Sequence, residues 1–245
     1  MNKKRILVVN DDGYDSVGID ILAKHLLKYG DVTVYAPKTG QSAQSQAITC
    51  FTPLKREEIF DLGYKCYAVD GKPADCVRMA TGLEEDFDLV FSGINNGFNI
   101  GIDTLYSGTV GAALDANLHG ISSIAMSAPR HKVLEFEHIL DEVIEKCFEL
   151  AGELGTDMYC LNVNLPKSPV DIKGYKLTKI GYFVDNMEMI EYSDGFKQAK
   201  YNLDYDKNDL SIDYAAHEAN YISISPLTWD KTHYAHLNVL NTKKQ

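Results

Sequence analysis

Two side chains able to bind a cation stand next to each other near the start of the chain. Asp11 and Asp12 follow directly after the apolar run Ile6 to Val9. Adjacent carboxylates at the end of a buried strand repel each other and resist the loss of water, so the arrangement is unfavourable unless a cation neutralises it. The pair therefore points to a divalent metal site, and it makes Asp11 and Asp12 the candidate catalytic residues.

Two further polar clusters also follow predicted strands. Ser42 ends the run TGQS after the strand DVTVYA, and Asn95 lies in SGINNG after the strand that begins at Asp88. The carboxyl ends of parallel strands meet at one edge of a sheet, so Ser42 and Asn95 are expected beside the aspartates. Carboxylate, amide and hydroxyl oxygens suit Mg²⁺ or Mn²⁺, whereas zinc would favour His or Cys. We expect one such ion per subunit.

A structural interpretation of the Asp-Asp-Gly run competes with the metal site. Asp11 and Asp12 could form only an Asx-turn and cap the helix that follows Gly13. For an isolated run that interpretation is favoured. The coincidence of three strand ends carrying oxygen ligands favours the metal site instead.

A second constellation suits a phosphate group. Ser107, Gly108 and Thr109 open a helix of small residues. A glycine allows close approach of the backbone, the helix start offers free N–H groups and partial positive charge, and the two hydroxyls add donors. Asn99 and Asp103, just upstream, could add an amide donor and an orienting carboxylate. Ordinary helix capping by Ser107, Thr109 or Asp103 is the alternative.

Several common catalytic motifs do not occur in the sequence. It contains no GxxxxGK[ST] phosphate loop, no GxGxxG after a strand and no GxSxG elbow. ATP hydrolysis by a Walker motif, dinucleotide redox chemistry and esterase chemistry therefore lose support.

Strands and helices alternate along the first two thirds of the chain. This rhythm predicts an α/β fold, a Rossmann-like three-layer sandwich with a mostly parallel sheet covered on both faces. Short apolar runs predict the strands, and a 3.6-residue apolar period predicts the helices. The expected strands are Arg5–Val9, Asp31–Ala36, Asp88–Ser92 and Ile121–Ser127. The expected helices are Asp15–Tyr29, stopped by Gly30, then Gly108–Leu118 and the long Lys132–Leu154.

The pattern changes after Pro166 to short alternating stretches such as Tyr175–Phe183 and Tyr221–Ser225. We expect a single domain over 1–245, with a Rossmann-like core over 1–165. Over 166–245 we expect additional strands, β-hairpins and a C-terminal segment that extend the sheet or reach another subunit. The polar stretch from Tyr192 to Asp213 is expected to be a solvated surface excursion, with a mobile loop near the site as the alternative.

Composition limits the partners and the compartment. A net charge of −11 argues against binding a nucleic acid polymer, because a polyanion needs clustered Lys and Arg. No signal peptide or membrane-spanning run occurs, so we expect no membrane association and a cytoplasmic location. The five cysteines lack a CxxC pair and are expected to be buried thiols.

Four stretches in the correct order resemble the SurE family of survival-protein nucleotidases. They are ILVVNDDGYDSVGIDILAKHL, APKTGQSAQS, DGKPADCVRMA and DLVFSGINNGFNIGIDTLYSGTVGAALDA, within about the first 130 residues. Asp213 and YISISPL resemble a later strand of the family. One departure is Phe98, a bulky aromatic residue before Asn99 that could stack on a base or line the pocket.

The resemblance implies a metal-dependent hydrolase that removes phosphate from nucleoside 5′-monophosphates, or also from 3′-monophosphates. The family's metal ligands fall on Asp11, Asp12, Ser42 and Asn95, and its phosphate-contacting residues on Asn99, Ser107, Gly108 and Thr109. It also implies a homodimer or homotetramer with exchanged C-terminal segments. Attack on phosphorus by water, or by an aspartate that forms an aspartyl-phosphate, both remain open. The alternative function is a non-catalytic regulatory module that binds metal and nucleotide.

Overall fold

A nine-stranded sheet runs through the centre of the computed structural model, which describes residues 3–83, 86–155, 157–182, 188–198 and 205–242. The strand order is β3-β4-β2-β1-β5-β6-β7-β11-β8. The strands are β1 (Lys4–Val9), β2 (Gly30–Pro37), β3 (Arg56–Ile59), β4 (Lys65–Val69), β5 (Leu89–Asn96), β6 (Ser123–Ala128), β7 (Cys160–Asn164), β8 (Tyr175–Leu177) and β11 (Ile222–Leu227). All neighbours are parallel except β3 on β4 and β11 on β7. The sheet is therefore mostly parallel, as the sequence predicts.

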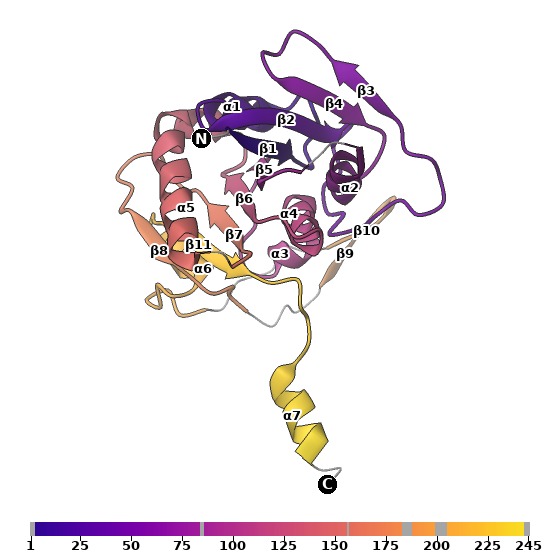
Figure 1. The fold of residues 1–245 in the computed structure, drawn as a ribbon. Helices are drawn as coiled ribbons and strands as arrows, with labels where there is room; N and C mark the ends of the chain where they lie inside the picture. Colours follow the sequence, from indigo (N-terminus) through magenta and orange to yellow (C-terminus); the bar gives the residue numbers. More distant parts are fainter. Residues whose placement is uncertain (1–2, 84–85, 156, 183–187, 199–204, 243–245) are drawn as a thin grey trace.

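Helices cover both faces of this sheet (Figure 1). One face carries α1 (Val17–Leu26) and α5 (Leu140–Leu154), and the other carries α2 (Pro73–Leu83) and α4 (Gly108–Leu118). Short helices α3 (Asp103–Tyr106) and α6 (Asp213–Glu218) lie in the connections. The expected α/β sandwich with three layers is confirmed.

Alternation along β1 builds the two halves of the core. Ile6 and Val8 pack into the cluster that includes α1 and α5, while Leu7 and Val9 pack into the cluster that includes α2 and α4. Successive strand residues point to opposite faces, so an uninterrupted apolar run is what a strand buried on both faces requires. This explains why β1 reads as four consecutive apolar residues before Asn10.

The register places three strand ends together. β1 lies between β2 and β5, with Val8 opposite both Val34 and Phe91. These strands run in the same direction, so the loops after Val9, Pro37 and Asn96 leave from one edge of the sheet. Asp11, Asp12 and Ser42 lie in the loops after β1 and β2, whereas Asn95 lies near the end of β5, which continues beyond the predicted strand Asp88–Ser92.

The structure corrects several predicted boundaries. The expected helix Lys132–Leu154 is divided into a 3₁₀ helix, η1 (Val133–Ile139), and α5. Apolar spacing over one or two turns fits a 3.0 period as well as 3.6, so it cannot distinguish these helices. Gly30 is not the helix stop: α1 ends at Leu26, and Gly30 is the first residue of β2.

Other elements were absent from the prediction or shorter than expected. The sequence analysis did not predict β3, β4, α2 or β7. The expected strand Tyr175–Phe183 is only β8, and its last residue lies outside the described residues. Cys50 is exposed, so the expectation that all five thiols are buried is wrong; the other four are buried.

The C-terminal part contains the expected hairpin and a projecting helix. Strands β9 (Met189–Tyr192) and β10 (Gly195–Gln198) pair antiparallel, so the stretch after Tyr192 is not loop throughout. Helix α7 (Tyr234–Thr242) extends away from the rest of the molecule (Figure 1) and has no buried residue. In the described part of the chain, no helix is long and apolar enough to cross a membrane.

Close packing of α1 on β5 yields a stability prediction. A Cβ at Gly18 would lie 2.0 Å from the carbonyl oxygen of Ile94, so the helix can approach β5 only without a side chain there. We expect Gly18→Ala to lower the free energy of unfolding by about 1–3 kcal/mol, measured by urea denaturation. The matched control is Gly152→Ala in α5, where an added Cβ meets nothing within 4 Å. It should be neutral or raise stability by up to about 1 kcal/mol, and equal losses in the two variants would contradict this account.

Candidate active site

The hydrogen bonds of the turn after β1 are made by the Asn10 side chain and not by those of Asp11 and Asp12. The Asn10 amide nitrogen donates to the Gly13 carbonyl and to the Ser16 hydroxyl, both at 2.8 Å, and the Gly13 N–H donates to the Asn10 amide oxygen at 3.2 Å. Ser16 is the N-cap of α1. Asp11 and Asp12 therefore do not cap α1, and the turn-and-cap interpretation of the pair is wrong.

Asp11 lies against the start of α4 and the loop after β2. The Thr109 hydroxyl donates to Asp11 Oδ1 at 2.5 Å, and the Gln41 N–H donates to the Asp11 carbonyl at 2.7 Å. A Cβ at Gly108 would lie 2.9 Å from Asp11 Cβ and 3.0 Å from Asp11 Oδ2. Glycine at position 108 therefore permits the helix to begin against this carboxylate.

Asp12 connects to the loop after β5. The Asn96 N–H donates to Asp12 Oδ2 at 2.9 Å, and the Asn96 side-chain oxygen accepts from the His131 N–H at 2.6 Å. His131 follows β6. One chain of hydrogen bonds thus links the ends of three adjacent strands.

Seven predicted side chains line one pocket with a volume of about 470 Å³. They are Asp11, Asp12, Ser42, Asn95, Asn99, Asp103 and Ser107. The amide nitrogen of Asn95 donates to the Gly97 carbonyl at 2.8 Å, so this side chain offers its oxygen to a ligand. The four predicted metal ligands therefore come together at the sheet edge.

The start of α4 combines capping with access to the pocket. Ser107 is the N-cap of α4, where its hydroxyl accepts from the Val110 N–H at 3.1 Å, and it also lines the pocket. Gly108 and Thr109 are not among the lining residues; Thr109 is fully buried with its hydroxyl on Asp11. Ser107 thus caps α4 and also lines the pocket, whereas the Thr109 hydroxyl contacts Asp11.

Asn99 is fixed by the strand ends beyond β5. Its backbone N–H donates to the Asn164 side-chain oxygen at 2.8 Å, and its amide nitrogen donates to the Ser127 hydroxyl at 2.8 Å. An amide nitrogen carries two hydrogens, so one remains for a ligand in the pocket. Asn99 is therefore held rigidly by β6 and β7, the second of which the sequence analysis did not predict.

The sequence analysis did not single out Arg130, which also lines the pocket. It is the cationic residue among the described residues that line this volume. It follows β6, so the rule that placed Ser42 and Asn95 at strand ends applies to it as well. That signal was available, because Arg130 stands three residues after the predicted strand Ile121–Ser127.

Burial perturbs both carboxylates. It raises the pKa of Asp11 from 3.8 to about 6; the negative charge of Asp12 adds to this rise, and the Thr109 hydroxyl opposes it. Burial also raises the pKa of Asp12, and the Asn96 N–H and the positive charge of Arg130 oppose that rise. In their ionised forms both carboxylates are therefore poorly solvated, and a bound cation would compensate for the missing water.

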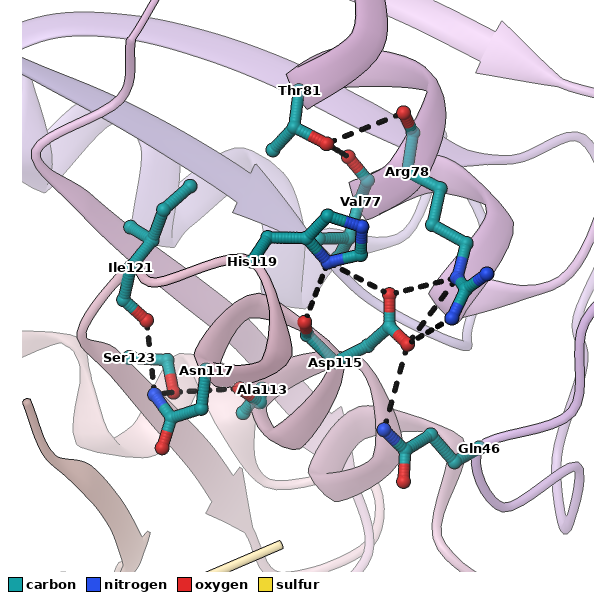
Figure 2. Close-up of polar contacts among 10 residues, drawn as sticks. All are labelled: Gln46, Val77, Arg78, Thr81, Ala113, Asp115, Asn117, His119, Ile121 and Ser123. Carbon is teal, nitrogen blue, oxygen red and sulfur yellow. Dashed lines mark hydrogen bonds and ion pairs between the residues drawn. The ribbon is translucent and has the colours of Figure 1, made fainter.

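A second carboxylate network holds α4 in place (Figure 2). Asp115, on α4, is 1% exposed and accepts from the Arg78 guanidinium of α2 at 3.1 Å on each oxygen. Gln46, from the same loop as Ser42, donates to Asp115 at 3.5 Å. One buried carboxylate thus ties together α2, α4 and the loop that carries a predicted ligand.

The C-terminal part of the chain anchors the loop that follows β5. Asp213 is fully buried, and its carboxylate accepts from the N–H groups of Gly101 at 2.7 Å and Gly181 at 2.8 Å. A Cβ at Gly101, where φ is +54°, would lie 2.0 Å from the Tyr214 ring. The loop after β5 is therefore anchored by residues far along the chain.

The donor chemistry of the pocket fits a hard divalent cation. Two carboxylates, one amide oxygen and one hydroxyl converge there, and such oxygen ligands are preferred by Mg²⁺ and Mn²⁺. Within the described ranges, no group of three or more His, Cys, Asp or Glu side chains comes together in a way that could hold a metal. An all-protein zinc cluster thus finds no support in that part of the molecule.

Comparison with known proteins settles the family. A family model described as "Survival protein SurE" matches residues 6–185. The chain belongs to the SurE family. SurE relatives match it over nearly its whole length: a "5'-nucleotidase SurE" from Thermoanaerobacter sp. (strain X514) is 36% identical, with 97% of each chain covered. Another protein with that name, from Haemophilus influenzae, is 37% identical over 94% of this chain and 93% of its own.

A solved SurE structure shares the fold. The crystal structure of the SurE protein from Aquifex aeolicus superposes with a TM-score of 0.80 and is 33% identical, covering 98% of this chain and all of that one. The resemblance seen in the first part of the sequence therefore extends through the C-terminal strands.

The raised pKa of Asp11 predicts a pH-dependent stability change. Because the folded state holds this proton more tightly than the unfolded chain, stability falls as the pH rises from about 4 to 6 and stays lower above that. We expect Asp11→Asn to be more stable than wild type in metal-free buffer near pH 8, by up to about 3 kcal/mol, with the difference vanishing near pH 4. Thermal melts in EDTA check this.

The control is Asp31→Asn, a 70%-exposed carboxylate that should show no such difference. A variant at Asp11 that is less stable than wild type near pH 8 would contradict the desolvation argument.

Proposed function

We propose that this chain is a divalent-metal-dependent phosphomonoesterase that hydrolyses nucleoside 5′-monophosphates to nucleoside and phosphate, with 3′-monophosphates as further candidate substrates. The observation that carries the proposal is the contact between the buried Asp11, next to the partly buried Asp12, and the start of α4, with the Thr109 hydroxyl on Asp11 Oδ1 at 2.5 Å. This contact supports a cation site beside a phosphate site. Relatives named 5′-nucleotidase support the choice of substrate.

In the proposed site, Asp11, Asp12, Ser42 and Asn95 would hold one Mg²⁺ or Mn²⁺ per subunit. A divalent ion there would neutralise the two carboxylates and withdraw charge from a phosphoryl oxygen. The protein donors on Asp11 Oδ1 and Asp12 Oδ2 fix the orientation of both side chains. Each carboxylate therefore keeps its other oxygen for the cation. Neither side chain would have to be reoriented when the cation binds.

The remaining phosphoryl oxygens would meet positive potential from two sources. The N-terminus of α4 carries partial positive charge beside the pocket, which Ser107 lines, and Gly108 permits the close approach of the helix to Asp11. Arg130 and the amide of Asn99 line the same volume. These groups are held by strand ends and helix caps, so the charge that develops during phosphoryl transfer meets donors already in place.

Activity with and without metal tests the proposal. We expect purified protein to release phosphate from AMP or GMP with Mg²⁺ or Mn²⁺, and EDTA to abolish release. Asp12→Asn keeps an oxygen acceptor for the Asn96 N–H but removes a charge, so it should reduce kcat by about 100-fold or more. Phosphate release is measured colorimetrically, with Asp31→Asn as the matched control.

Undiminished activity in EDTA would overturn metal dependence. Nucleotide binding without phosphate release, across both 5′- and 3′-monophosphates, would instead favour a regulatory module that retains the pocket.

We also propose that the C-terminal segment pairs with another copy of the chain in a homodimer or homotetramer. Helix α7 buries none of its residues here, and it exposes Tyr234, Leu237, Val239 and Leu240. A projecting helix with these apolar side chains gains stability by covering them. Light scattering should give a multiple of the 27.3 kDa chain mass, and deletion of α7 should lower that multiple. A monomeric full-length chain at micromolar concentration would contradict this.

A further inference from the structure

A second cavity adjoins the pocket at Phe98 and Asp103. Its volume is about 230 Å³, and it shares Phe98 and Asp103 with the larger pocket. Its other lining residues are Ile100, Tyr205, Tyr214, His217 and Glu218. A ligand whose phosphate lies near Ser107 can therefore extend past Phe98 into this cavity.

Aromatic rings form most of its wall. Phe98 contacts His217 edge-to-face with 3.9 Å between ring centroids, and Tyr205 stacks on Tyr214 at 5.4 Å. Tyr214 and His217 are 4% and 3% exposed, whereas Phe98 and Tyr205 are only partly buried. All four rings line the cavity, and Phe98 and Tyr205 are the ones that keep the more accessible ring surface.

The aromatic part of the wall is uncharged at neutral pH, and the acidic lining residues are Asp103 and Glu218. Burial lowers the pKa of His217 to about 4, so the ring behind Phe98 stays neutral. An uncharged aromatic surface binds flat, weakly polar groups by stacking and by release of water.

Phe98 has a fixed position relative to the phosphate-binding groups. Its neighbour Asn99 is tied to Asn164 and Ser127 by hydrogen bonds of 2.8 Å each. On the other side, Gly97 adopts φ of +151° and receives the Asn95 amide hydrogen bond. The ring at position 98 is therefore positioned by the same loop that carries a predicted metal ligand and a predicted phosphate ligand.

We propose that Phe98 and Tyr205 form the nucleobase subsite, in which the base of the substrate stacks on their rings. This proposal rests on the proposed nucleotidase function and specifies how the site separates nucleotides from other phosphate monoesters. Stacking on an aromatic ring tolerates every base, because each base has a π face. The larger ring system of a purine gains more from it than a pyrimidine does.

Comparison of a nucleotide with its base-free counterpart tests the subsite. Ribose 5-phosphate keeps the scissile phosphate and the sugar of AMP but lacks the base. We expect Phe98→Leu and Tyr205→Leu each to lower kcat/KM for AMP by about 5- to 100-fold, mainly through KM, and to leave kcat/KM for ribose 5-phosphate unchanged. Phe98→Tyr should retain activity toward AMP, because it keeps the ring.

The matched control is Phe60→Leu, the same replacement at a ring that is 70% exposed and outside both cavities. It should change neither substrate. Thermal melts identify variants that fail to fold. If Phe98→Leu does not fold, Tyr205→Leu provides the test of the subsite.

Three outcomes would overturn the subsite while leaving the phosphatase intact: equal losses on AMP and ribose 5-phosphate, no loss on AMP, or wild-type kcat/KM equal for both substrates. A loss on AMP in Leu134→Ala but not in Phe98→Leu would place the base in the aliphatic groove beyond Asp12, which Leu134 lines. Failure of the proposed function itself looks different, because wild-type protein would then hydrolyse neither substrate.

Discussion

The contact between Asp11 and the beginning of α4 is the constraint on which the arrangement of the pocket depends. A carboxylate that is 4% exposed stands at the end of the central strand, and its solvation is replaced by the Thr109 hydroxyl and by whatever ligand occupies the pocket. To bring the helix this close, position 108 must lack a side chain. Helix α4 must also be held in place, and the Asp115 carboxylate on α4 does this by accepting hydrogen bonds from the Arg78 guanidinium on α2. The unfavourable burial of the Asp11 charge is thus offset by the interactions that hold α4 beside it. Such an arrangement is common at functional sites.

The central part of this architecture follows from simple sequence rules. A continuous apolar run before Asn10 indicated a strand buried on both faces, and the common direction of parallel strands brought Asp11, Ser42 and Asn95 to one edge. The same rules did not predict elements whose apolar patterns are short. Strands β3 and β4 and helix α2 lie in a stretch without sustained periodicity, and η1 has a spacing compatible with either helix type. Boundaries were missed for the same reason, because caps such as Ser16 are recognised from side-chain geometry.

Within the site, residue types were predictable but partnerships were not. The sequence indicates that Thr109 stands at a helix start suited to phosphate, yet its hydroxyl is committed to Asp11. Asn10, next to the aspartates, proved to be the residue that shapes their turn. Arg130 required knowing that the loop after β6 reaches the same pocket. Such pairings depend on three-dimensional approach between segments up to a hundred residues apart, which no local pattern encodes.

The anchoring of Gly101 by Asp213 has a consequence for the order in which the chain can complete its pocket. The two residues are 112 positions apart, and at about 5–20 residues per second a ribosome would need roughly 6 to 22 seconds to synthesise the intervening segment. Asn164, which holds Asn99, emerges earlier, 65 positions after it. The part of the pocket formed by Asp11, Asp12 and Asn95 can therefore assemble before Asp213 is available to anchor the loop that carries Phe98. The two carboxylates after β1 are therefore synthesised and positioned well before the part of the pocket beside Phe98 exists.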